Sequence, residues 1–249
     1  MTLLTQNIEL ARKLKEGDYN LNTMKIYGHY ASQPARSVLW LLKMHKKPFE
    51  FIKVEPLAGG TKKADFANKF PTRQIPTMDD EGFYLAESSA IMQYICEKYQ
   101  LEQFWSLNPK HIQSRAKIAE YLSYHHQSTR KLSGLLAFPL FKQKFFKKQW
   151  DEQDKQTSIK TGKEILTSFE HIFLPTLNTN TTTATYIQGL PHPTIADLAA
   201  YSEIAQLEQL QIMTIDSKEY PKLSIWLNNM SKLPEHDDIF ATVKKIGAM

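Results

Sequence analysis

The stretch YGHYASQPARSVLWLLK, residues 27–43, joins an aromatic segment to a helical pattern within a few residues. Residues 24–30 are typical of a strand. Apolar residues then recur at helical spacing, namely Val38, Leu41 and Leu42. Pro34 suits a first helical turn, where a missing N–H costs nothing. Ser32 therefore lies at the N-terminus of a predicted helix over 34–45, where its hydroxyl can either cap the helix or help to hold an anion.

The pattern around this stretch predicts a small α/β unit. Residues 49–56 alternate with period two and are expected to form a second strand. Residues 75–80 and 81–87 are expected to pair as a hairpin, with its turn at 79–82. Residues 88–99 show helical spacing. The order β-α-β-β-β-α, with a short helical segment before the hairpin, implies one mixed sheet.

Helical periodicity dominates after a linker at 104–111. A long helix is predicted over 151–177, with an inward face formed by Ile165, Phe169, Ile172 and Phe173. Residues 177–185 are expected to form a polar loop. Thr194 and Asp197 have the spacing of a capping box at the start of a helix over 193–210.

We therefore predict three segments along the chain. Residues 1–23 form an N-terminal extension, residues 24–104 an α/β domain, and residues 110–249 an all-helical domain. The chain has 249 residues, of which 42% are hydrophobic, enough for a large core.

Composition excludes several classes of protein. No apolar run approaches the roughly 20 residues of a membrane span, and the polar first 23 residues lack the apolar centre of a secretory signal, so we expect a cytoplasmic protein. The single cysteine, Cys96, excludes an internal disulfide and a C-x-x-C redox or zinc site. A formal charge of +5 is modest and indicates no particular partner.

Three stretches together resemble one family, the glutathione transferases, and its theta class in particular. They are SQPAR at 32–36, IPTM at 75–78 followed by LAESSAIMQYI at 85–95, and TIADL at 194–198. The resemblance spans about residues 24–245. It implies a thioredoxin-like domain followed by a helical domain, usually in a homodimer. It also implies glutathione as co-substrate, with no metal or other cofactor.

The resemblance implies that the Ser32 hydroxyl donates a hydrogen bond to the sulfur of glutathione. Only the thiolate is nucleophilic, and a free thiol has a pKa near 8.5. Lowering that pKa by about two units takes roughly 2.7 kcal/mol. A hydrogen bond to a charged group supplies about 1.5–3 kcal/mol and a helix N-terminus about 0.3–1 kcal/mol. Tyr30 is the alternative, because several sister classes use a tyrosine on the first strand.

The family also implies residues that bind glutathione. The bond between Ile75 and Pro76 is expected to be cis, which leaves the main chain of Ile75 free to pair with the cysteinyl backbone as an added strand. Gln74 lies beside it, and Gln33 follows Ser32. Glu87 and Ser88 are expected to hold the ammonium and carboxylate of the γ-glutamyl group, although ordinary helix capping would use the same two residues.

The contact for the glycyl carboxylate is open. Theta enzymes carry a histidine in the loop after the second strand, and counting back from Pro76 places Thr61 there. Lys62 and Lys63 follow it, either as the missing cation or as a solvated pair. Phe70 stands before Pro71 where the family usually has asparagine, which implies a local structural change.

Few residues indicate the electrophile side. Arg130 lies four residues after His126, on one face of a predicted helix, and resembles an arginine that faces the active site of theta enzymes; a surface position is the alternative. Residues 138–150 mix phenylalanines with lysines. They form either an amphipathic helix over the electrophile pocket or a stacking and phosphate surface for nucleic acid. Cys96 falls at a predicted core position.

The sequence thus predicts an enzyme that adds glutathione to hydrophobic electrophiles such as alkyl halides and epoxides, with the reduction of organic hydroperoxides as a further activity. We expect neither nucleic acid nor a membrane as a partner. The alternative is a non-catalytic interaction or structural protein with the same fold. Intact Ser32, Gln33, Glu87 and Ser88 favour the enzyme, because a scaffold has no need of this set.

Overall fold

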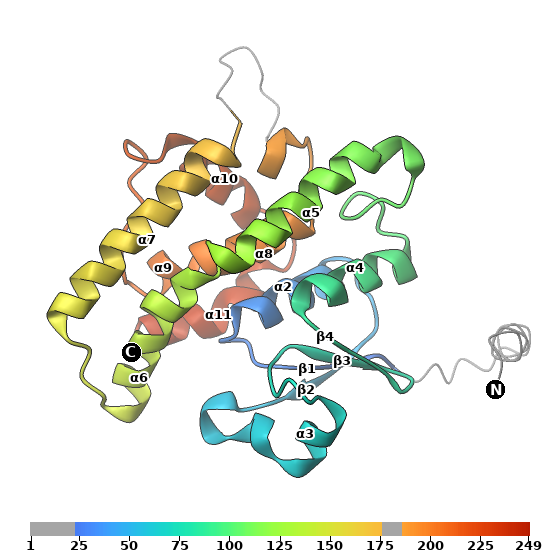
Figure 1. Cartoon of the computed structure of the whole chain (residues 1–249), viewed down its shortest axis with the longest axis horizontal. Coiled ribbons are helices and arrows are strands. Elements are labelled where there is room, and N and C mark those ends of the chain that lie inside the picture. The colour runs from blue at the N-terminus through green and yellow to red at the C-terminus, as the bar shows by residue number, and fades with distance from the viewer. Residues whose placement is uncertain (1–22, 176–185) are drawn as a thin grey trace, which may run out of the picture.

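The computed structural model describes residues 23–175 and 186–249 (Figure 1). Nearly all of the predicted extension, and the predicted polar loop, lie outside the described residues. A four-stranded sheet with its helices is followed by an all-helical half, so the predicted fold class is confirmed.

The sheet is mixed, as expected. Its strands are β1 (Lys25–Gly28), β2 (Glu50–Lys53), β3 (Thr77–Asp80) and β4 (Phe83–Ala86), in the order β2-β1-β3-β4. β1 pairs in parallel with β2 and antiparallel with β3, which in turn is antiparallel to β4. The first two strands are shorter than predicted, because each leaves the sheet before its alternating pattern ends.

The hairpin turn lies one residue later than predicted. Asp80 pairs with Phe83, so the two turn residues are Glu81 and Gly82. Their φ angles, 55° and 85°, are both positive, as in the tight turn that matches the twist of paired strands. Asp79 instead accepts a hydrogen bond from the Gly82 N–H through its side chain.

Helices α2 (Gln33–Met44) and α4 (Ser88–Tyr99) separate the sheet from the helical half (Figure 1). α2 packs against α8 (Ile195–Ile204), and Trp40 of α2 is fully buried. Its indole N–H donates to the carbonyl oxygen of Pro234 at 2.8 Å. The first helix is therefore a shared core element of both halves, which fixes its N-terminus relative to the helical half.

Short helical turns connect β2 to β3. They are η1 (Pro56–Ala58), η2 (Gly60–Lys62) and α3 (Ala64–Lys69). The buried ring of Phe70 packs against Tyr27, Phe66 and Tyr84. The Phe70 side chain, before Pro71, is thus a core contact of this connection.

The helical half begins after the buried Phe104 and Trp105. Its elements are η3 (Pro109–His111), α5 (Ile112–Gln127), the π-helical turn η4 (Ser133–Ala137), α6 (Phe138–Phe146), α7 (Glu152–Ile172), η5 (Ile187–Gly189), α8, α9 (Gln206–Gln209), α10 (Pro221–Ser231) and α11 (His236–Gly247).

The inward position predicted for Ile172 is wrong. Ile172 is 60% exposed, because the buried face of α7 is set by Leu166 and Phe169 and the helix ends at this residue. The helix predicted over 193–210 corresponds to α8 and α9, which adjoin at Ala205, where the backbone keeps helical φ and ψ angles of −62° and −27°. The capping box of Thr194 and Asp197 is confirmed.

Candidate functional site

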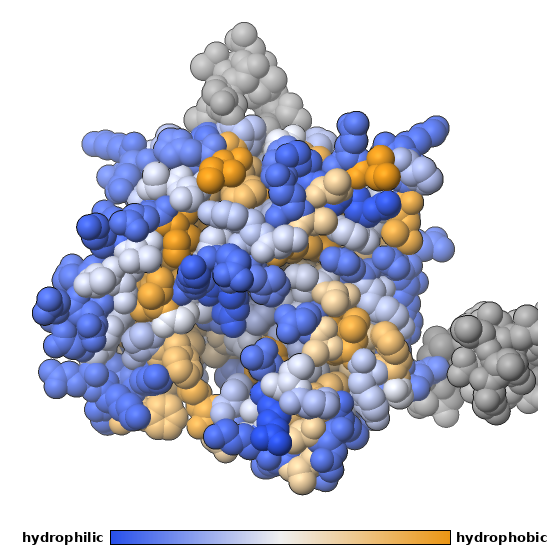
Figure 2. All heavy atoms as spheres, viewed as in Figure 1, coloured by the Kyte–Doolittle hydropathy of each residue, from blue (hydrophilic) through white to orange (hydrophobic). Residues whose placement is uncertain are grey.

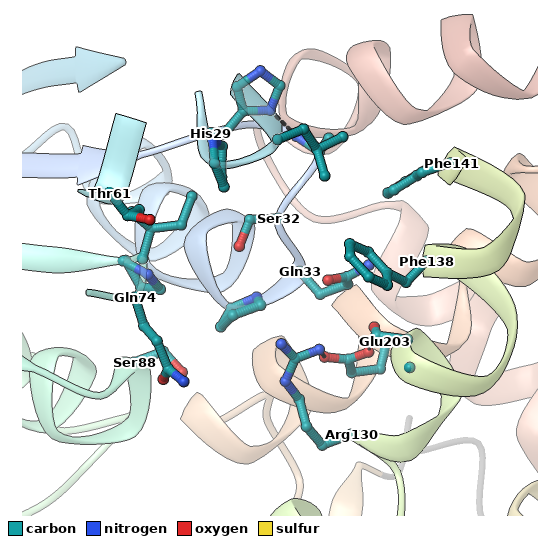
Figure 3. A pocket seen from close by; sticks show the side chains of 18 of the residues that line it. His29, Ser32, Gln33, Thr61, Gln74, Ser88, Arg130, Phe138, Phe141 and Glu203 are labelled. Carbon is teal, nitrogen blue, oxygen red and sulfur yellow. Dashed lines mark hydrogen bonds and ion pairs between the residues drawn. The ribbon is translucent and has the colours of Figure 1, made fainter. Parts of the chain in front are cut away.

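A cavity of about 1120 Å³ lies between the two halves. Its walls come from the β1–α2 turn, the loops before β3 and α4, the end of α5, η4, α6 and α8. Figure 2 shows the surface hollowed between the region of α6 and that of α3, and Figure 3 shows side chains of both halves pointing toward one another across the space.

Ser32 is the N-cap residue of α2, and its hydroxyl lines the cavity (Figure 3). Its own N–H donates to the His29 carbonyl oxygen at 2.9 Å. In the described structure the hydroxyl makes no capping hydrogen bond to α2. The oxygen therefore sits at the positive end of a helix with its donor available to a ligand.

Tyr30, the alternative, is placed differently. Tyr30 is not among the described residues that line the cavity. Its ring packs edge-on against Phe51, with centroids 5.1 Å apart, and the Lys43 ammonium lies 5.7 Å from its centre. Its carbonyl oxygen accepts a hydrogen bond from Arg36.

The loop before β3 forms the facing wall. The bond between Ile75 and Pro76 is cis, as the resemblance implied. Ile75 and Gln74 both line the cavity, and Thr61, only 8% exposed, lies beside Gln74 on the same wall (Figure 3).

Glu87 and Ser88 complete this side. Ser88 is the first residue of α4, so its N–H and hydroxyl lie at a helix N-terminus. Glu87 precedes it with φ 69° and ψ 113°, a conformation that is costly for a residue with a side chain. Both line the cavity, and Glu87 is exposed to it. Strain of this kind at a cavity wall points to a binding role.

Two titratable residues on this side, Arg73 and His29, were missed by the sequence analysis. Arg73, just before Gln74, lines the cavity, whereas Lys62 and Lys63 are exposed and are not among its described lining residues. No motif pointed to Arg73, although a cation next to the predicted Gln74 was a usable signal.

His29 is the second residue that was missed. Its Nδ1 accepts the Ala31 N–H at 3.0 Å, and its Nε2 lies 3.3 Å from the Glu55 carboxylate. A ring that accepts at Nδ1 and donates at Nε2 is neutral. Burial lowers the pKa of His29, and the nearby Glu55 opposes that shift.

Gln33, which was expected to bind glutathione, contacts the helical half. It is buried, and its side-chain amide donates to Gln206 Oε1 of α9 at 2.6 Å. Although it lines the cavity, its donor is used by the helical half.

The electrophile side is built by η4, α6 and α8. Phe138, Phe141, Phe145 and Phe146 of α6 line the cavity. Phe138, Phe145 and Phe146 are each more than 40% exposed, so this wall offers apolar surface to a ligand. The helix ends at Phe146, earlier than the predicted residue 150.

Arg130 lines the same side, but not on a helix face shared with His126. α5 ends at Gln127, and Arg130 lies in the turn that follows. Its Nη1 donates to Glu203 Oε1 at 3.0 Å. Glu203, 1% exposed, was missed; its signal was one carboxylate within the apolar run of α8. Burial raises the pKa of Glu203, and the Arg130 guanidinium opposes that shift.

Cys96 lies in the core and burial raises the pKa of its thiol, so it is not a reactive thiolate. Within the described ranges there is no group of three or more His, Cys, Asp or Glu side chains placed to hold a metal ion. A search of the same residues finds no helix long and apolar enough to span a membrane.

Comparisons with known proteins agree with this arrangement. Residues 22–97 match a family model described as "Glutathione S-transferase, N-terminal domain", and residues 137–235 match "Glutathione S-transferase, C-terminal domain". Mouse glutathione S-transferase theta-3 is 34% identical over 123 residues, 47% of this chain and 50% of the relative. Human glutathione S-transferase theta-1 is 28% identical over 211 residues, 82% and 80% of the two chains.

Solved structures have the same fold. The apo form of human glutathione-S-transferase T1-1 aligns with a TM-score of 0.78 and 24% identity, over 91% of each chain. Human glutathione transferase theta-2, in complex with glutathione and an unknown ligand, aligns with a TM-score of 0.76 and 24% identity, over 90% of this chain and 89% of that one.

Proposed function

Because the chain belongs to the glutathione S-transferase family, with theta-class relatives, we propose that it binds glutathione and transfers the thiol to hydrophobic electrophiles. This chain spans about half the length of mouse glutathione S-transferase theta-3 in their match. The proposal therefore rests mainly on the site.

The position of Ser32 carries the proposal. Its hydroxyl lines the cavity at the N-terminus of α2 and makes no capping bond within the described chain. It donates to the sulfur of glutathione and stabilises the thiolate. This hydrogen bond and the helix terminus supply about 2–4 kcal/mol together, enough to lower the thiol pKa by about two units.

The opposite wall holds the rest of the tripeptide. Ser88 and the N-terminus of α4 bind the γ-glutamyl carboxylate, and Glu87 binds its ammonium. The cysteinyl backbone pairs with Ile75 as an added strand. The glycyl carboxylate lies toward Thr61 and Gln74, with Arg73 rather than Lys62 as its cation.

The aromatic wall of α6 receives the electrophile. The thiolate attacks an electrophilic carbon, a C–S bond forms, and a halide leaves or an epoxide ring opens to an alkoxide that takes a proton from water. Apolar alkyl halides and epoxides fit Phe138, Phe145 and Phe146, and organic hydroperoxides are a further class. Arg130 faces the same space and stabilises the negative charge that leaves.

We extend the proposal to a homodimer, which the family resemblance implies, and to a role in detoxification within the cytoplasm. Neither nucleic acid nor a membrane is a proposed partner. If the protein bound glutathione but catalysed no transfer, the non-catalytic alternative would replace this proposal.

Retention on glutathione resin followed by turnover of an alkyl halide tests the proposal. Elution by free glutathione, but not by the dipeptide Cys-Gly, is expected if Glu87 and Ser88 hold the γ-glutamyl group. Halide release that depends on both glutathione and Ser32 supports the transferase. A protein that passes through the resin and releases no halide would contradict both binding and catalysis.

A further inference from the structure

Five side chains form a continuous hydrogen-bonded chain along one wall of the cavity, which we call the Gln206 bridge: Gln33, Gln206, Ser133, Glu203 and Arg130. Gln206 Oε1 accepts from Gln33 Nε2 at 2.6 Å, and Gln206 Nε2 donates to Ser133 Oγ at 3.0 Å. The Ser133 hydroxyl donates to Glu203 Oε2, and Glu203 Oε1 accepts from Arg130 Nη1 at 3.0 Å.

The amide of Gln206 is used completely. Its oxygen also accepts from Arg36 Nη2 at 3.2 Å, and its nitrogen lies 3.5 Å from Glu203 Oε2. Because a guanidinium only donates, the oxygen of Gln206 must face Arg36, which leaves the nitrogen facing Ser133. A side chain with two donors and two lone pairs, all engaged, has one orientation.

The bridge is buried along nearly its whole length. Gln206 is 0% exposed, and Gln33, Ser133 and Glu203 are all buried. Only Arg130 is partly open, with 38% of its side chain exposed. In such surroundings hydrogen bonds strengthen one another, and removing one member leaves the others without partners.

The two ends of the bridge come from different halves of the chain. Gln33 is the first residue of α2, directly after Ser32, whereas Arg130 follows α5 in the helical half. Figure 3 shows Gln33, Glu203 and Arg130 together on one wall of the cavity. Ser133 lies in the π-helical turn η4, a feature that often occurs at functional sites.

We propose that Gln206 is a positioning residue that links the two halves of the chain at the site. It holds the first turn of α2, and with it Ser32, in register with Arg130. The inference rests on the proposed function, since it assigns Ser32 to glutathione and Arg130 to the electrophile.

The test compares Gln206→Met with Gln209→Met. Methionine keeps the length of the side chain and removes the amide. Gln209 lies on the same helix α9, and its Oε1 has no hydrogen-bond partner within the described chain, so the control removes an amide outside the bridge.

Three readouts are measured. In the ligand-free protein, the side-chain ¹⁵N relaxation of Arg130 Nε reports its order. With glutathione bound, thiolate absorbance against pH gives the thiol pKa. Steady-state kinetics with an alkyl halide separate KM from kcat.

In Gln206→Met we expect a more mobile Arg130, a bound thiol whose pKa rises by about half a unit, and a KM for the halide raised about threefold or more. Gln209→Met should match the wild type. Gln33→Leu breaks the bridge at its other end and should show the same effects. It takes the place of Gln206→Met if that variant does not fold.

An unchanged Arg130 order, thiol pKa and KM in a folded Gln206→Met protein would overturn the inference, and so would equal effects in Gln209→Met. A wild-type protein that does not bind glutathione would instead overturn the proposed function. In that case the side-chain relaxation of Arg130, compared between ligand-free wild type and Gln206→Met, still shows whether the bridge orders Arg130.

Discussion

The carboxylate of Asp197 and the backbone N–H of Thr194 lie 2.8 Å apart and close a buried capping box at the start of α8. The same carboxylate accepts from the Thr194 hydroxyl, from the Ile187 N–H and from the Trp226 indole N–H. Asp197 is 0% exposed. One side chain therefore joins α8, η5 and α10.

Asp197→Ala should destabilise the fold strongly. Each buried donor left without a partner costs about 1–3 kcal/mol, and four donors lose their acceptor, so we expect a loss of at least about 4 kcal/mol in the free energy of unfolding. Urea unfolding followed by circular dichroism measures it. Asp151, the exposed N-cap of α7, is the matched control, because Asp151→Ala removes a cap in water and should cost about 0.5–2 kcal/mol.

The role of Asp197 is expected to be structural only. The KM for glutathione is measured on the folded fraction of Asp197→Ala or of the milder Asp197→Asn. It should stay within about twofold of the wild-type value, because the hydrogen bonds that are lost cap a helix and do not contact the ligand. Equal losses at Asp151 and Asp197, or a KM raised tenfold at full stability, would refute this assignment.

Stability should fall in mild acid because of His125. This ring is buried against Tyr121, and burial lowers its pKa from 6.5 to about 3. As pH falls below about 6.5, His125 is protonated in the unfolded chain but stays neutral in the folded protein. The free energy of unfolding therefore has its full value above that pH and decreases as pH falls toward 3, by at most about 1.36 kcal/mol per pH unit.

Unfolding curves for His125→Gln and His126→Gln between pH 4 and 8 test this. His126 is the neighbouring exposed histidine and serves as the control. The slope of stability against pH should flatten in His125→Gln alone. The same slope in both variants and the wild type would show that His125 is not the group responsible.

Glu87→Gln should weaken glutathione binding. The substitution removes the negative charge that pairs with the γ-glutamyl ammonium while keeping the size of the side chain. Because Glu87 is exposed in the ligand-free protein, we expect a loss of about 1–2 kcal/mol, between the values for a surface ion pair and for a buried charged hydrogen bond. Calorimetry measures the affinity.

Glu81→Gln is the control, since Glu81 is also exposed and also has a positive φ but lies in the hairpin turn. A glutathione analogue without the γ-glutamyl amine should bind wild type and Glu87→Gln equally. If the analogue still distinguished the two proteins, Glu87 would not be the partner of the ammonium.

Much of this architecture could be predicted from local patterns. The turn from β1 into α2 and the capping box of Asp197 each depend on a few neighbouring residues, whereas the cis bond between Ile75 and Pro76 was implied by the family resemblance. Local patterns could not place Arg130, because the end of α5 at Gln127 has no strong stop signal.

The contacts of Gln33 were equally hidden from the sequence. Its partner, Gln206, lies 173 residues away along the chain and meets it only when the two halves pack. Ile172 was assigned inward by spacing alone, but the end of α7 turns its side chain out to solvent. Contacts between distant elements are decided by packing, which one periodic pattern does not contain.

The central claim is that the Ser32 hydroxyl stabilises the thiolate of bound glutathione, and its most direct test is the pH titration of thiolate absorbance in wild type, Ser32→Ala and Tyr30→Phe. We predict a pKa about two units below 8.5 in wild type and Tyr30→Phe. Ser32→Ala should raise it by about one to two units, the equivalent of one hydrogen bond to a charged group, with glutathione affinity within about threefold. A titration that is unchanged in Ser32→Ala but shifted in Tyr30→Phe would contradict the claim and assign the thiolate to Tyr30.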